Sequence, residues 1–303
     1  MNTIHPPART RKLMLTAVVV VVLLALGLLI NAVLPFRIVA AALKSKASFT
    51  HCAGDARVLC EPGSEALGKA SASHLDDAVA TVARLQHGSF PKPIVVYTYA
   101  TAESFLAHTG YSHPRATVIN GAIHVSPTAL REPMRLLVIH EMSHLAFYQA
   151  TGMLTMAQLP TWFVEGLATY VASGGGAGDV TAEGAARRMA EGMCIRPETS
   201  HSLLKLIDRV PADISARQLY RQGAMLVAYL HEVDPPAFER LMAGLAGEEH
   251  FADAITSAYG VPMSVLWPRF LEHTRNEINR DYDAGLGPLC AAFAASGVSG
   301  QRK

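Results

Sequence analysis

Residues 136–147 read Leu-Leu-Val-Ile-His140-Glu141-Met-Ser-His144-Leu-Ala-Phe, an H-E-x-x-H pattern inside an apolar run. In a helix, a spacing of four residues places both imidazoles on one face, so the two rings can share one metal ion. Glu141 then stands beside them, where a zinc hydrolase needs its general base. The pattern therefore predicts a zinc site, although a chain with thirteen histidines can also produce this spacing by chance.

A catalytic zinc site usually takes three protein ligands and keeps one position for water, so a further ligand is required. Glu165 is the candidate, because it lies on the next predicted helix. The connection 151–160 can fold that helix back antiparallel to the first and bring the carboxylate to the two imidazoles. Gly166 and Ala168 are small and would let the two helices approach closely.

Together, His140-Glu-Met-Ser-His144 and Trp162-Phe-Val-Glu165-Gly-Leu-Ala168 resemble the gluzincins, the thermolysin-like clan of zinc metallopeptidases, in which W-x-x-E-G-x-A supplies the third ligand. Residues 71–275 are also similar in order to the bacterial peptidase MA-like group. In that order, a strand and a helix precede an edge-like segment at 121–125, then come the zinc helix and a helical second half.

This resemblance implies a definite site and mechanism. One Zn²⁺ ion would be held by His140, His144 and Glu165, beside the scissile carbonyl and a water molecule. Glu141 would take the proton of that water and pass it to the leaving amine. The substrate would be a peptide or protein.

One departure from the clan restricts the substrate. Membrane-type aminopeptidases of this clan carry a G-x-M-E-N segment before the zinc helix, whose glutamate holds the free amine of the substrate. This chain has Gly121-Ala-Ile-His124-Val instead. Aminopeptidase specificity is therefore not implied, and an endopeptidase or a narrower processing role is the expectation.

Tyr220 is the predicted donor to the oxyanion of the transition state, because it lies on a helix that follows in the resembling group. The alternative is a core tyrosine with a satisfied hydroxyl. Thr169, one turn after Glu165, is either a partner that orients this ligand or an exposed helix residue. Tyr170 and His231 are weaker candidates for the same donor role. His124 and His201 are expected at surface or loop positions rather than as metal ligands.

Residues 13–36 carry no charge and are long and apolar enough to cross a bilayer as a helix. We interpret them as a membrane anchor, with a cleaved signal peptide ending near 40–42 as the alternative. The basic residues on its two sides are equal in number, so the positive-inside rule does not orient it.

The four cysteines give the orientation. They are Cys52, Cys60, Cys194 and Cys290, and none has a metal-ligand or C-x-x-C spacing. We expect the pairs 52–60 and 194–290 among three possible connectivities, with four buried free thiols as the alternative. Because disulfides require an oxidising compartment, the large C-terminal part is expected on the periplasmic side of a bacterial inner membrane.

The chain as a whole predicts an α+β zincin domain of thermolysin-like type, with a small strand-containing lobe, the active-site helix and a helical C-terminal lobe. The expected order is a cytoplasmic tail at 1–12, the anchor at 13–36, a linker with a disulfide loop at 37–70, the metallopeptidase domain at 71–285 and a tail at 286–303. Strands are expected at 94–99 and in two pieces around Asn120-Gly121, and helices at 71–86, 101–110, 133–150, 159–170, 182–193, 201–209, 214–232, 235–246, 249–259 and 263–283.

A net charge of +1 gives no sign of nucleic-acid binding, and the sequence does not indicate an oligomeric state. Two rival functions remain open at this point. One is a membrane-anchored scaffold or binding protein that has kept the zinc fold without turnover. The other is a structural zinc site, although such sites usually have four protein ligands and are rich in cysteine.

Overall fold

The computed structural model describes residues 18–21, 40–41, 43–112, 114–195, 197–199 and 214–291. These residues form a mixed α+β fold, as the sequence predicts, with one five-stranded sheet in the first half. The strands are β1 (Thr50–Cys52), β2 (Asp55–Cys60), β3 (Val96–Thr98), β4 (Ala116–Ile119) and β5 (Ala122–Val125). The helices around the sheet are α3 (Glu65–Ala72), α4 (Leu75–Gln86), α5 (Ala102–Thr109) and the 3₁₀ turn η1 (Pro127–Arg131).

The sheet has the strand order β1-β2-β3-β5-β4. Strands β2, β3 and β5 run parallel, whereas β4 pairs antiparallel with β5. Asn120 and Gly121 join β4 to β5 with φ values of 51° and 74°, and these left-handed conformations suit a tight two-residue hairpin turn. The two predicted strand pieces are therefore confirmed. The segment expected at the edge, 121–125, is however an interior strand, and the edge strand is β4.

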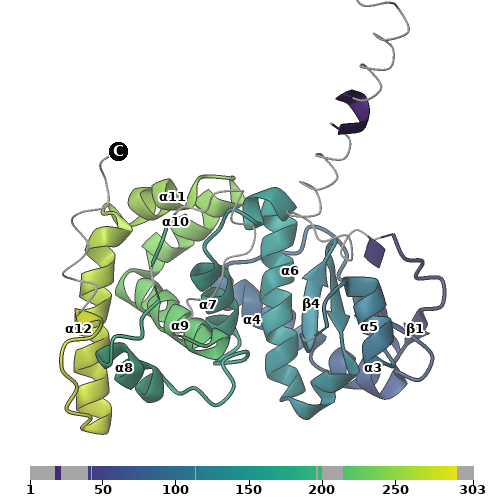
Figure 1. Ribbon diagram of the computed structural model, residues 1–303, viewed down its shortest axis with the longest axis horizontal. Helices are drawn as coiled ribbons and strands as arrows, with labels where there is room; N and C mark the ends of the chain where they lie inside the picture. The colour runs from purple at the N-terminus through teal and green to yellow at the C-terminus, as the bar shows by residue number, and fades with distance from the viewer. Residues whose placement is uncertain are drawn as a thin grey trace, which may run out of the picture.

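Helix α6 (Met134–Met156) lies in the middle of the molecule (Figure 1). It starts directly after Pro133, whose fixed φ suits the entry to a helix. Its regular part ends at Gly152, which has φ 77° and ψ 170°. The predicted bounds of this helix, 133–150, are thus close to the observed ones. The sheet, α3 and α5 lie on one side of α6, and the later helices lie on the other (Figure 1).

The second half is helical, and no strand follows β5 among the residues that the structure describes. Its helices are α7 (Thr161–Val171), α8 (Ala182–Ala190), α9 (Ala216–Val233), α10 (Pro235–Ala246), α11 (Phe251–Tyr259) and α12 (Met263–Tyr282). Each matches a predicted helix, and the helix expected at 201–209 lies outside the described residues. The disulfide Cys194–Cys290 joins the segment after α8 to the segment after α12, and Cys52–Cys60 joins β1 to β2, so both predicted pairings are confirmed.

The structure differs from the predicted boundaries at both ends of the domain. The region expected as a linker, 37–70, contains β1, β2 and most of α3, and its Val58 and Leu67 belong to the main hydrophobic core. The helix expected at 71–86 is two helices, α3 and α4, separated by a turn at 73–74. In the region expected as a C-terminal tail, Leu289 and Cys290 are buried in the same core.

The predicted membrane anchor, 13–36, lies outside the described residues except for 18–21. Within the part of the chain that the structure describes, no helix combines the length and apolarity needed to cross a bilayer.

Candidate metal centre

Helix α6 presents His140 and His144 side by side on one face. Both side chains are buried, and their Nε2 atoms lie 3.1 Å apart. The helix is apolar on most of its circumference because it packs against the sheet on one side and against helices on the other. The two imidazoles are therefore directed to one point inside the protein, as the spacing of four residues predicts.

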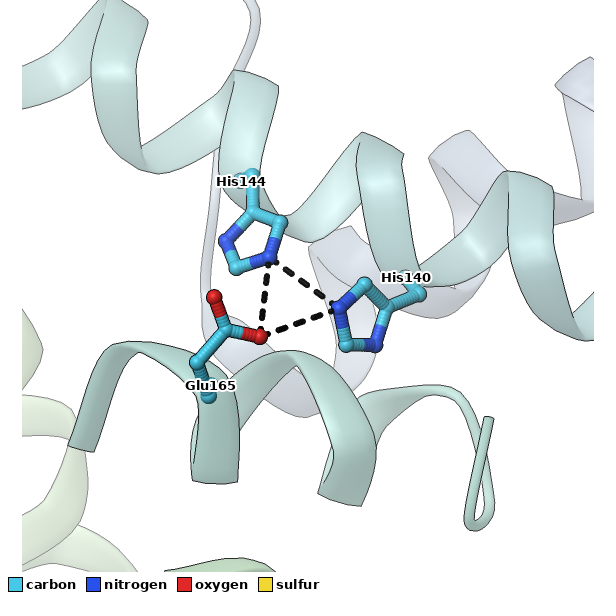
Figure 2. Close-up of side chains that lie close together, drawn as sticks. All are labelled: His140, His144 and Glu165. Carbon is cyan, nitrogen blue, oxygen red and sulfur yellow. Dashed lines mark hydrogen bonds and ion pairs between the residues drawn. The ribbon is translucent and has the colours of Figure 1, made fainter. Parts of the chain in front are cut away.

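Glu165 on α7 completes the group. Its Oε2 atom lies 3.4 Å from Nε2 of His140 and 3.6 Å from Nε2 of His144, and the carboxylate points between the two rings (Figure 2). All three ligand atoms lie within 4.8 Å of one another. The predicted third ligand is thus brought to the two histidines, and the group can hold a metal ion.

The three distances fit a tetrahedral ion. Ligand bonds of about 2.0–2.2 Å at tetrahedral angles place the donor atoms roughly 3.3–3.6 Å apart. The observed separations of 3.1, 3.4 and 3.6 Å lie close to that range. Two imidazole nitrogens and one carboxylate oxygen are also a donor set that zinc accepts, and three ligands leave one position for water or substrate.

The two histidines also determine the charge of the Glu165 carboxyl. Burial by itself raises the pKa of the Glu165 carboxyl, but His144 and His140 outweigh it and hold this pKa below its ordinary value. Glu165 is therefore ionised over the physiological range and can serve as an anionic ligand.

Glu141 lies next to this group but outside it. It is 6% exposed, and its Oε2 atom has no hydrogen-bond partner among the described residues. Burial raises the pKa of Glu141 to about 7, with His140 lowering it and Glu165 raising it. A buried carboxylate with a free oxygen and a pKa near neutrality is suited to accept and return a proton.

Tyr220 on α9 also reaches the centre. Its ring stacks on His140, with 6.1 Å between the ring centroids and 27° between the planes. Burial raises the pKa of the Tyr220 hydroxyl, and the nearby Glu165 raises it further. The hydroxyl therefore stays protonated and can donate a hydrogen bond.

A close helix crossing brings Tyr220 to Glu165. Helices α7 and α9 touch through their backbones where Gly166 meets Gly223, and a Cβ atom on Gly166 would lie only 2.5 Å from the carbonyl carbon of Gly223. Glu165 and Tyr220 stand within one turn of this contact point on their respective helices. The sequence signals Gly166 as a small residue beside the ligand, whereas its partner Gly223 could not be identified without the tertiary structure.

The ligand atoms face a cleft of about 480 Å³. One wall is formed by residues 114–118, which lead into and include most of the edge strand β4, and the other by α6 and α7. Glu141 and Glu165 are the carboxylates among the described residues that line it, and Arg115 is its cation. The remaining lining is mostly apolar: Leu137, Met156, Val164, Val118 and Pro114.

Other sequence candidates lie elsewhere. His124 is not a surface or loop residue but is fully buried on β5, because this strand is in the interior of the sheet. Thr169 is buried rather than exposed, and its hydroxyl has no hydrogen-bond partner among the described residues, so it does not orient Glu165. Tyr170 and His231 form a hydrogen bond with each other at 3.1 Å and do not line the cleft. His201 lies outside the described residues.

Comparison with known proteins gives no family for this chain. No model of a protein family matches the sequence, and a search of curated proteins likewise finds no match. The geometry of the centre and the two motifs that form it are therefore the features of this chain that bear on its function.

Proposed function

We propose that this protein is a zinc-dependent metallopeptidase that hydrolyses peptide bonds in the cleft beside β4. The observation that carries the proposal is the convergence of His140, His144 and Glu165, with the free carboxylate oxygen of Glu141 beside them in an open cleft. Three ligands and an adjacent base are the requirements of metal-assisted hydrolysis, whereas structural zinc sites are usually closed by four protein ligands.

The side chains of the centre have distinct roles in this proposal. The two imidazoles and Glu165 would hold a zinc ion, which would supply a Lewis acid next to the scissile carbonyl. Glu141 accepts a proton from the attacking water and then donates it to the nitrogen of the leaving amine. Tyr220 donates its hydroxyl hydrogen to the oxyanion that develops on the carbonyl oxygen.

An extended peptide suits the shape of the cleft. β4 is the last strand of the sheet, so its outer backbone groups can pair with a substrate chain added as a further strand. The apolar wall of the cleft provides contact surface for side chains. No third carboxylate lies among the described lining residues to bind a free amine, which supports an endopeptidase over an aminopeptidase.

We further propose that the domain works in an oxidising compartment at a membrane surface. The two disulfides support this, because such bonds persist outside the cytoplasm. The apolar segment 13–36 supplies the anchor in this proposal. The disulfides favour the periplasmic side of the membrane, and the resemblance to a bacterial peptidase group favours a bacterial inner membrane.

The rival function is a membrane-anchored zinc-binding scaffold without turnover. Glu141 argues against it, because its buried Oε2 atom has no hydrogen-bond partner among the described residues. Burying such an oxygen is costly, and a site without turnover has no need of it. The two functions differ in one observable, which is hydrolysis.

The test is cleavage of a peptide library and an unfolded protein by the zinc-loaded full-length chain. Glu141→Gln is expected to retain one zinc per chain and to lower the cleavage rate by about 10²–10⁴-fold, because it removes the general base. Glu239→Gln, an exposed change on α10, is the control and should leave the rate unchanged. Zinc binding by the unmodified chain without cleavage of any substrate would favour the scaffold.

A further inference from the structure

The loop after α7 contacts His140, one of the three residues of the metal centre. Residues 173–180, which we call the glycine loop, contain the run Gly174-Gly-Gly176 and follow the end of α7. The sequence alone predicts only that this run of glycines ends the preceding helix. In the structure, it packs against α6 on one side and against α9 on the other.

The first contact is a hydrogen bond to a metal ligand. Nδ1 of His140 lies 3.0 Å from the carbonyl oxygen of Gly175. Figure 2 shows this second ring nitrogen pointing away from His144 and Glu165, while Nε2 points toward them. A carbonyl oxygen only accepts, so Nδ1 must carry the hydrogen, and the lone pair of Nε2 is left for a metal ion.

The second contact leaves no room for a side chain. Gly176 has φ 93°, and a Cβ atom there would lie 2.8 Å from Cε1 of His140 and 3.3 Å from Cδ2 of Tyr220. At Gly175, a Cβ atom would lie 2.9 Å from the carbonyl oxygen of Leu136. The glycine loop therefore reaches the His140 ring only because Gly175 and Gly176 lack side chains.

The third contact fixes the loop to α9. Arg221 is next to Tyr220 in the chain, and its Nε atom donates to the carbonyl oxygen of Val180 over 2.7 Å. Its guanidinium group packs against Gly174. Burial lowers the pKa of Arg221. The half-buried guanidinium group nevertheless donates a charge-assisted hydrogen bond to the backbone of the glycine loop.

We propose that the glycine loop is a positioning element for the metal centre: the Gly175 carbonyl fixes His140 in the tautomer that can bind a divalent metal ion, and Arg221 holds the loop in place. This inference rests on the proposed function in one respect, the role of His140 as a metal ligand. Hydrogen bonds to the distal nitrogen of a ligand histidine raise metal affinity by orienting the ring and selecting its tautomer.

The first test measures zinc affinity of the full-length chain by competition with a chelator. Gly176→Ala is expected to weaken zinc binding by about 10–100-fold, because the methyl group displaces the His140 ring from the carbonyl. Gly192→Ala is the matched control, since Gly192 has a similar φ of 89° but no atom within 4 Å of the added Cβ. Equal zinc affinity of the two variants would overturn the proposal.

Arg221→Met provides a second variant in case Gly176→Ala does not fold. It removes the hydrogen bond to Val180 while keeping an unbranched side chain, and zinc binding should again weaken. Arg240→Met is its control, because Arg240 also donates to a backbone carbonyl, that of Ala258, but lies on α10. A loss of zinc affinity of the same size in both arginine variants would mean general destabilisation and would overturn the role of Arg221.

The second readout is independent of zinc and of catalysis. Nitrogen-15 spectra of the metal-free protein at alkaline pH distinguish the two histidine tautomers, and the His140 signal is assigned by its loss in His140→Ala. The unmodified chain should show hydrogen on Nδ1, and Gly176→Ala should shift His140 toward the other tautomer. If the chain bound no zinc, the proposed function would fail while this spectrum would still decide the role of the glycine loop. An unchanged tautomer in Gly176→Ala would overturn it.

Discussion

The protein buries histidines on β5 as well as on α6, and the two places differ in what surrounds the rings. His140 and His144 on α6 meet a carboxylate and face a cleft. His124 on β5 is buried just as deeply but stacks on Tyr97 and Tyr99 and does not line the cleft. Burial of a histidine therefore does not by itself mark a metal site.

The surroundings of His124 explain why it is not a ligand. Its Nδ1 atom lies 2.6 Å from the hydroxyl of Tyr99, and Phe49 packs edge-on against Tyr99 and Tyr97. Burial, with smaller contributions from Lys46 and His108, lowers the pKa of His124 to about 3. The ring is thus a neutral core residue. What distinguishes the α6 histidines is a third, anionic donor at the same point and access for a substrate.

The largest expected difference between the two places is metal binding. His140→Ala should abolish tight zinc binding and with it peptide cleavage, because two ligands do not hold a catalytic zinc ion. His124→Gln should keep one zinc per chain, since Gln can still bond to Tyr99. Metal analysis of both purified variants checks this, and zinc loss in His124→Gln would show that the comparison is wrong.

The two tyrosines beside these histidines should also differ. Tyr220→Phe is expected to lower kcat by about 10²–10³-fold with little change in KM, because in the proposed mechanism its hydroxyl donates to the oxyanion of the transition state. Tyr99→Phe should leave kcat unchanged. Steady-state kinetics with zinc content measured in parallel make the comparison, and full turnover by Tyr220→Phe would remove this residue from the mechanism.

A smaller effect concerns the helix crossing that assembles the α6 site. Gly223→Ala should lower the free energy of unfolding by about 1–3 kcal/mol, because its methyl group would overlap the carbonyl oxygen of Trp162. Gly244→Ala, inside α10, meets the end of the flexible Glu249 side chain and, at an ordinary contact distance of 3.6 Å, the Cβ atom of Ala254, so it should be neutral or slightly stabilising. Denaturant unfolding of the metal-free proteins measures both, and equal stabilities would refute the close crossing.

A last effect is confined to acidic pH, where His124 adds a pH dependence to the stability of the fold. Its pKa is about 3 in the folded protein and near 6.5 when unfolded, so the unfolded state binds more protons between these values. The free energy of unfolding is therefore not lowered by His124 above pH 6.5. As the pH decreases from 6.5 toward 3, protonation of His124 in the unfolded state lowers it by up to about 1.4 kcal/mol per pH unit. Unfolding curves of His124→Gln should show a weaker loss in acid than those of the unmodified chain. If the free energies of unfolding of the two proteins fell equally with decreasing pH, His124 would not be a neutral, buried residue.

Much of this fold follows from local sequence patterns. The apolar run between Pro133 and Gly152 predicts α6. Apolar periodicity predicts the helices of the second half, because helix faces repeat every three to four residues regardless of their partners. Asn120-Gly121 predicts the β4–β5 turn through its left-handed conformations. The two H-E-x-x-H histidines converge for the same local reason, since a spacing of four fixes their relative position within one helix.

Other features required contacts between distant segments. The hairpin 50–60 joins the sheet because β2 pairs with β3. The sequence of this segment predicts a disulfide loop but not its pairing with a distant strand. The interior position of β5 and the edge position of β4 depend on strand order, and strand order is set by long-range pairing.

The sequence by itself determined the chemistry available at the centre: two imidazoles one turn apart, a base beside them and a glutamate on the next helix. The tertiary structure decided how these groups are held. The Gly166–Gly223 contact that brings Tyr220 to Glu165, and the Gly175 carbonyl that faces His140, join residues on separate elements. The physical reason is that a spacing rule acts only within one helix, whereas distances between elements are set by how closely their backbones can pack.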